Sequence, residues 1–181
     1  MRIIAGIYKS RILKTLKGQN TRPMTDRMKE SVFNIIGPYF DGGTVLDLFG
    51  GSGALSFEAL SRGASKAYIC DLSKDAIKII KENVTLLGVD SQVFVLNMDY
   101  KAALKKLQDQ KFDLIFLDPP YRLNIVNEII DYLLKNEMIN QDAYIICHFV
   151  KGNVDKNQIN ALSLIKNYAY GSSEVLIYKM D

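Results

Sequence analysis

The chain has 181 residues, enough for one well-buried domain, and 48% of them are hydrophobic, as in ordinary soluble globular proteins. A lone histidine, His148, excludes a zinc site built on several histidines, and neither cysteine has metal-site spacing, so we expect no metal and two reduced core thiols. Nothing resembles a signal peptide, and no apolar run reaches the roughly 18 residues of a membrane helix, which together with reduced thiols favours a cytoplasmic protein.

Basic side chains are concentrated near the N-terminus. The formal net charge is +3, but residues 1–30 carry eight basic and two acidic side chains, so they bear +6 and the remainder bears −3. Arg2–Gly6 and Arg11–Leu13 are short apolar runs with basic residues between them, so residues 2–17 are expected to form a small β-hairpin. A basic segment on a slightly acidic body is typical of nucleic-acid-binding proteins, although a merely solvated surface has the same composition.

A helix is expected to follow this hairpin. Thr25 is a suitable N-cap, and the apolar residues after it recur on one helical face until about Ile36, before Gly37. On this pattern Arg27 and Lys29 point toward solvent or substrate.

From residue 43 onward, strand-like and helix-like segments alternate. The expected strands are Thr44–Leu48, Ala67–Cys70, Val93–Leu96, Leu114–Leu117 and Ala143–Cys147. The expected helices are Ala54–Ser61, Lys74–Leu87, Lys101–Gln108 and Ile125–Lys135. Apolar strands separated by helices indicate an α/β fold with a parallel sheet covered on both faces. Leu162–Tyr170 and Glu174–Tyr178 are expected to add a β-hairpin at one sheet edge.

A glycine turn follows the first of these strands. Gly50, Gly51 and Gly53 would let a ligand approach the backbone closely. A dinucleotide fingerprint starting at Gly51 would need Gly or Ala at position 56, where the chain has Ser56. The spacing therefore speaks against a nucleotide-dependent oxidoreductase.

Three acidic residues lie at or just after the ends of successive strands. Asp47 suits the amino group of a methionine-like moiety, Asp71 suits two ribose hydroxyls, and Asp99 would lie at an adenine end. Each acid alone could be a helix cap or a turn residue. Together they predict one shared cleft that holds S-adenosylmethionine.

The fourth strand is followed by Asp118-Pro119-Pro120-Tyr121. An exocyclic amine of a nucleobase is a poor nucleophile, and the Asp118 carboxylate and the Pro119 carbonyl could accept its hydrogens during methyl transfer. The two prolines make the turn rigid. Tyr121 offers a face on which a base could stack. The alternative is a rigid turn without a catalytic role.

These motifs, with the segment Arg22–Asn34 and the opening Arg2–Gly6, resemble the RsmD-type 16S ribosomal RNA guanine-N2 methyltransferases. The resemblance implies a Rossmann-like S-adenosylmethionine-dependent methyltransferase fold, with a mostly parallel seven-stranded sheet and a reversed last strand. It also implies methylation of a guanine N2 in 16S rRNA, guanine 966 in the family. Gly50 departs from the alanine usual in the family. His148 stands where related chains often carry an acid, and we expect a strand-end residue there, not a catalyst.

The resemblance and the motifs together predict three sets of site residues. The catalytic set is Asp118, Pro119, Pro120 and Tyr121. The cofactor set is Asp47, Phe49, Gly50, Gly51, Gly53, Asp71, Leu72 and Asp99. The RNA-binding set is Arg2, Arg11, Arg22, Arg27 and Lys29.

The expected organisation is an RNA-contacting hairpin and helix over residues 1–40 and a catalytic domain over residues 41–181. The expected partner is 16S rRNA, within an assembling small ribosomal subunit, bound by a monomer. A DNA adenine-N6 or cytosine-N4 methyltransferase is the first alternative, although such enzymes usually need a larger recognition region to read base edges. A non-catalytic RNA-binding assembly factor is the second.

Overall fold

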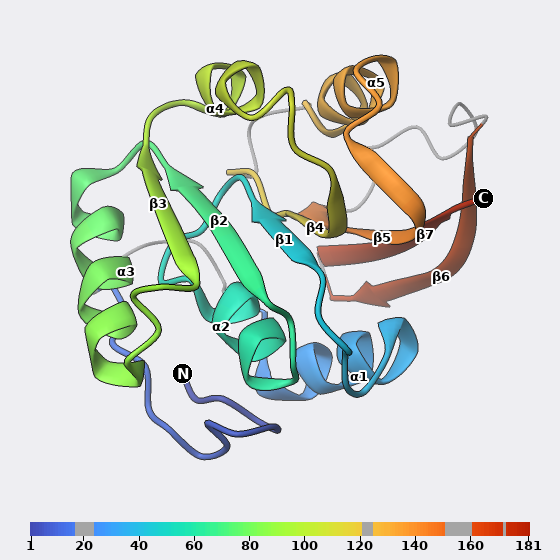
Figure 1. Cartoon of the computed structure of the whole chain (residues 1–181). Helices are drawn as coiled ribbons and strands as arrows, with labels where there is room; N and C mark the ends of the chain where they lie inside the picture. Colours follow the sequence, from blue (N-terminus) through green and yellow to red (C-terminus); the bar gives the residue numbers. More distant parts are fainter. Residues whose placement is uncertain (17–23, 121–124, 151–160, 172) are drawn as a thin grey trace.

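A computed structural model describes residues 1–16, 24–120, 125–150, 161–171 and 173–181. Within these residues, seven strands form one sheet in the order β3-β2-β1-β4-β5-β7-β6 (Figure 1). The strands are β1 (Thr44–Asp47), β2 (Lys66–Asp71), β3 (Val93–Asn97), β4 (Phe112–Leu117), β5 (Ile139–Val150), β6 (Leu162–Tyr170) and β7 (Ser173–Met180). β1 to β5 are parallel, and β7 pairs antiparallel with both β5 and β6. The predicted α/β fold with its reversed last strand is confirmed.

Helices cover both faces of this sheet (Figure 1). They are α1 (Asp26–Ile36), α2 (Ala54–Ser61), α3 (Lys74–Leu87), α4 (Tyr100–Lys106) and α5 (Val126–Lys135). The first three bury their apolar faces in one cluster, which includes Phe33, Phe57 and Ile80, and α4 and α5 bury theirs in a second. In the ranges that the structure describes, none of the helices has the length and apolar character that crossing a membrane requires.

The predicted boundaries agree closely with the structure except in β5. This strand begins at Ile139, whereas the sequence pattern indicated Ala143. Polar residues at positions 140–142 interrupt the apolar pattern, Asp142 has a φ of 63°, and the β4–β5 register shifts between Phe112 and Leu114. A local irregularity of this kind lets polar residues lie within a paired strand.

The N-terminal arm (residues 1–16) packs against α1, α2 and α3, the helices that share one core cluster. Its two segments meet at an isolated antiparallel bridge between Arg2 and Ile12, so the predicted hairpin is shorter than expected. Ile3 and Leu13 are buried in the same core cluster as residues of α1, α2 and α3. The arm is therefore part of the same hydrophobic core as these helices and is not a separate unit joined by a linker.

Candidate active site

A cleft of about 970 Å³ opens at the carboxyl ends of the parallel strands, where helices and loops leave the sheet. From here on it is called the central cleft. Ten predicted catalytic or cofactor residues line it: Asp47, Phe49, Gly50, Gly51, Asp71, Leu72, Asp99, Asp118, Pro119 and Pro120. Met1 and Thr15 of the arm also line it, as do Thr25 and Lys29 at the start of α1. The fold thus brings together residues from six separate parts of the sequence.

The glycine turn between β1 and α2 forms one wall of the central cleft. A Cβ at Gly50 would lie 2.4 Å from the Ile69 side chain, so an alanine at this position would require Ile69 to shift. Gly51 has a φ of 57°, and a Cβ on it would have no other atom within 4 Å, so its missing side chain faces open space. Gly53 does not line the cleft; it precedes α2 in the left-handed region and its Cβ would clash with Phe57.

Asp71 connects two turns at the edge of the cleft. Its carboxylate accepts hydrogen bonds from the Gly51 N–H and the Ser73 N–H, both at 2.8 Å. These bonds tie the glycine turn to the start of α3. Each carboxylate oxygen has a second lone pair with which it could accept a ligand hydroxyl.

Asp47 is buried at the bottom of the same site. Its two oxygens accept hydrogen bonds from the Phe49 N–H at 3.3 Å and from the Ser56 hydroxyl at 3.1 Å. Burial raises the pKa of Asp47 to about 7, and the negative charges of Asp118 and Asp71 add to this effect. Sequence reasoning missed Ser56, although a serine in the apolar second helix was a signal that its hydroxyl has a buried partner.

Asp99 and Leu72 lie at the exposed end of the cleft. Asp99 is the N-cap of α4, and it accepts hydrogen bonds from the Lys101 and Ala102 N–H groups at 2.9 and 3.1 Å. The helix-cap role that the sequence left open for Asp99 is therefore confirmed. Leu72 is 71% exposed, and an apolar side chain in that position offers a surface for a flat ligand.

Asp118 lies directly after β4, half-buried at the cleft, with Pro119 buried behind it and Pro120 exposed. Its Oδ1 lies 3.0 Å from Nδ1 of His148, whose side chain is 3% exposed. Sequence reasoning placed His148 only as a strand-end residue and did not connect it with Asp118. The predicted Tyr121 lies outside the described residues.

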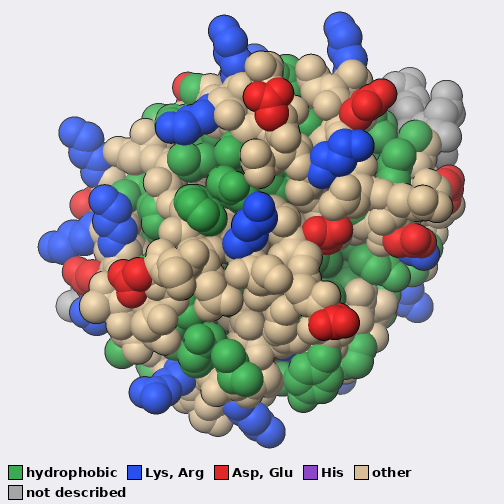
Figure 2. All heavy atoms as spheres, viewed as in Figure 1, with side chains coloured by type: hydrophobic (Ala, Val, Ile, Leu, Met, Phe, Trp, Pro, Cys, Tyr) green, Lys and Arg blue, Asp and Glu red, His purple; other side chains and the backbone are tan. Residues whose placement is uncertain are grey.

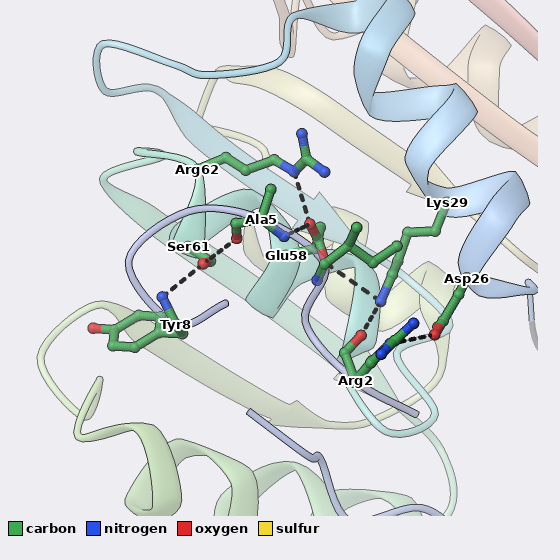
Figure 3. Close-up of polar contacts among 9 residues, drawn as sticks. Arg2, Ala5, Tyr8, Asp26, Lys29, Glu58, Ser61 and Arg62 are labelled. Atoms are coloured by element: carbon green, nitrogen blue, oxygen red, sulfur yellow. Dashed lines mark hydrogen bonds and ion pairs between the residues drawn. The ribbon is translucent and has the colours of Figure 1, made fainter. Parts of the chain in front are cut away.

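The prediction that Lys29 points toward solvent is wrong. Lys29 is 1% exposed; its Nζ lies 3.3 Å from Glu58 of α2 and donates a hydrogen bond to the Arg2 carbonyl at 2.6 Å (Figure 3). Glu58 also pairs with Arg62 at 2.7 Å. Burial lowers the pKa of Lys29, and Glu58 opposes that shift. Lys29 is therefore removed from the RNA-binding set, because it holds α1 and the arm on α2.

The other predicted RNA contacts differ in their surroundings. Arg2, Arg11 and Arg27 are all exposed. Arg2 forms an ion pair with Asp26 at 3.0 Å. None of these three lines the central cleft. Arg22 lies outside the described residues. Figure 2 shows basic side chains projecting along the lower edge of the molecule, where Figure 1 places the arm.

Comparison with known proteins finds relatives along nearly the whole chain. The family model Conserved hypothetical protein 95 matches residues 1–179. A putative rRNA methyltransferase of Bacillus subtilis, YlbH, is 38% identical over 181 residues, with 99% of this chain and 98% of that protein covered. Ribosomal RNA small subunit methyltransferase D of Haemophilus influenzae is 37% identical over 183 residues, covering 99% of this chain and 93% of that protein.

A solved structure agrees with these relationships. The putative methyltransferase yhhF from Escherichia coli superposes with a TM-score of 0.86 at 29% identity, covering all of this chain and 98% of that one. The similarity in sequence and the similarity in structure therefore both extend over nearly the full length of the chain. The chain belongs to the Conserved hypothetical protein 95 family, the family of the ribosomal RNA small subunit methyltransferase D proteins.

Proposed function

We propose that this protein transfers a methyl group from S-adenosylmethionine to the exocyclic N2 of a guanine in small-subunit ribosomal RNA. The observation that carries the proposal is the placement of Asp118 and Pro119 in the same cleft as the glycine turn and the three acids. Membership of a family that contains rRNA methyltransferases supports the substrate class. In its most specific form, the proposal is that the methylated base is guanine 966, the position that the family resemblance implies.

The residues of the central cleft fit this cofactor in three places. Gly51 leaves open space beside the backbone, so a ligand can approach the turn closely. Asp47 is a buried carboxylate with a raised pKa, and a cationic amino group beside it would stabilise its ionised form. Asp71 would accept hydrogen bonds from the ribose hydroxyls, with Phe49, Leu72 and Asp99 near the base. When bound, the cofactor supplies an electrophilic methyl group on a sulfonium.

Asp118 and Pro119 would act on the substrate amine. The guanine N2 lone pair is delocalised into the ring, so it attacks only if its hydrogens are held in a geometry that lets the nitrogen rehybridise. The Asp118 carboxylate and the Pro119 carbonyl accept these two hydrogens. N2 would gain positive charge as it accepts the methyl group, and the Asp118 carboxylate would stabilise that charge and then take one proton.

The test is methyl transfer by the purified protein, with nucleoside mass mapping of the product. We expect N2-methylguanosine in 16S rRNA, in free RNA or in small subunits, when S-adenosylmethionine is supplied. Duplex DNA offered in parallel tests the DNA adenine-N6 and cytosine-N4 alternatives. Methyladenine or methylcytosine in DNA, or no transfer to any of these substrates, would contradict the proposal; the last result would favour a non-catalytic assembly factor.

We further propose that residues 1–40 contact the RNA and that residues 41–181 form the catalytic domain. The contacts would come from Arg2, Arg11, Arg22 and Arg27, since the basic charge of the chain is concentrated there. The arm and the start of α1 both border the central cleft, so RNA held on them would lie beside Asp118.

Replacing Arg11 and Arg27 with alanine is expected to weaken RNA binding and to flatten its salt dependence. Each phosphate that a basic side chain neutralises releases counterions, so the slope of log affinity against log salt should fall by about one for each arginine that binds a phosphate. Filter binding across a salt series measures this slope. The matched control replaces Lys105 and Lys106 of α4, on the opposite face, which removes the same charge. Equal slopes for the two double variants would place the RNA surface elsewhere.

A further inference from the structure

We propose that His148 is a positioning residue that holds the Asp118 carboxylate in the orientation methyl transfer requires. This inference rests on the proposed function, because it concerns the residue that would accept the amine hydrogens. It starts from the 3.0 Å separation between His148 Nδ1 and Asp118 Oδ1.

The backbone around His148 is held from both sides. β5 lies between β4 and β7 in the sheet. Leu117 pairs with Cys147 in the β4–β5 ladder, so Asp118 and His148 are the next residues along two neighbouring strands. His148 itself pairs with Val175 of β7. A side chain on a central strand, 3% exposed, has little freedom to move, whereas the Asp118 side chain is 31% exposed and opens to the cleft.

The chemistry of the pair assigns the shared proton to histidine. A carboxylate only accepts hydrogen bonds, so Nδ1 must carry the hydrogen. The bond engages Oδ1 and leaves the second oxygen, Oδ2, to accept a hydrogen from the substrate amine. The terminal torsion of an aspartate is broad, so an Asp118 without this bond would sample many orientations. Transfer rates depend steeply on such geometry, and His148 would raise the rate by acting through Asp118.

Two nearly isosteric replacements separate hydrogen bonding from packing. His148→Asn keeps an N–H donor near the position of Nδ1, and His148→Leu has a similar shape without the donor. We expect His148→Leu to lower kcat for methyl transfer to rRNA by about ten- to a hundredfold. The KM for RNA and the Kd for S-adenosylmethionine are expected to stay close to wild type. His148→Asn is expected to recover most of the lost kcat, which a merely structural role would not predict.

The wild-type protein provides a second measurement that does not depend on how the variants fold. His148 is the only histidine of the chain, so ¹H–¹⁵N NMR of the labelled protein reports its ring without overlap. We expect a protonated Nδ1 whose resonance shifts in Asp118→Ala. An unprotonated Nδ1 would overturn the inference.

The outcomes also distinguish this inference from the proposed function. If wild type transfers the methyl group and the Asn and Leu variants have the same kcat, the positioning role is wrong and the proposed function stands. If wild type transfers none to rRNA, the proposed function fails and the positioning role fails with it.

Discussion

Replacing Asp118 with alanine is expected to lower methyl transfer to 16S rRNA by about a hundredfold to ten-thousandfold. The variant loses the carboxylate that would accept an amine hydrogen and stabilise the charge developing on N2. Affinity for S-adenosylmethionine is expected to change little, because the cofactor residues come from other turns of the cleft. Single-turnover methyl transfer measures the first effect, and calorimetry with the cofactor measures the second.

Two further variants make this result specific. Asp109→Ala removes an exposed acid after α4, away from the central cleft, and is expected to keep wild-type turnover. Asp118→Asn keeps one acceptor oxygen and loses the charge, so its rate is expected to lie between those of wild type and Asp118→Ala. Near-normal turnover in Asp118→Ala would show that the carboxylate is a turn residue and that the proposed chemistry is wrong.

Replacing Glu58 with glutamine is expected to destabilise the protein by about 3–5 kcal/mol. Glu58 is fully buried and lies between two buried cations, Lys29 and Arg62 (Figure 3). It also accepts the Ile4 and Ala5 N–H groups at 2.8 and 3.1 Å. Glutamine preserves the shape but leaves the two cations without their counter-charge. Urea unfolding of both proteins at neutral pH measures the difference.

The exposed pair Lys14–Glu82 provides the control for this experiment. Glu82→Gln also removes one acid from an ion pair, but solvent screens that pair, so we expect no change beyond the error of the measurement. The double variant Glu58→Gln with Lys29→Met removes one of the stranded cations. Its loss of unfolding free energy is expected to be smaller than the sum of the losses in the two single variants. Equal loss for Glu58→Gln and Glu82→Gln would contradict the importance of the buried charges.

The buried charged cluster of Lys29, Glu58 and Arg62 connects the stability of the protein with the candidate site. Glu58 lies in the helix that follows the glycine turn, and through Lys29 and the backbone of the arm it holds three parts of the chain together. Lys29 and Met1 border the central cleft. Loosening the cluster would therefore disturb the wall on which we propose that RNA lies. Retained cofactor affinity in Glu58→Gln, with weaker RNA binding, would locate the disturbance on that wall.

Local patterns were sufficient to predict most elements of the fold. The bounds of α2 and α3 follow from caps and apolar spacing, and the alternation of apolar strands with helices predicted the layered sheet. The glycine turn and the Asp118-Pro119 segment were also found from the sequence, because each depends on a few consecutive residues. Since the carboxyl ends of parallel strands meet at one edge, the pattern also predicted that Asp47, Asp71 and Asp99 share a cleft, and they do.

The sequence by itself therefore determined the fold class, the order of elements and the group of cleft residues, all of which follow from short-range spacing. Only the tertiary structure decided which side chains pair across the fold. Sequence patterns predicted an exposed Lys29 because its partner Glu58 lies in a different helix. They predicted no catalytic role for His148 because its partner Asp118 follows the neighbouring strand and is distant in sequence. Such pairings depend on strand register and helix packing. Burial makes the loss of a partner costly for Lys29, Glu58 and His148, because a buried polar group without a partner costs more free energy than an exposed one.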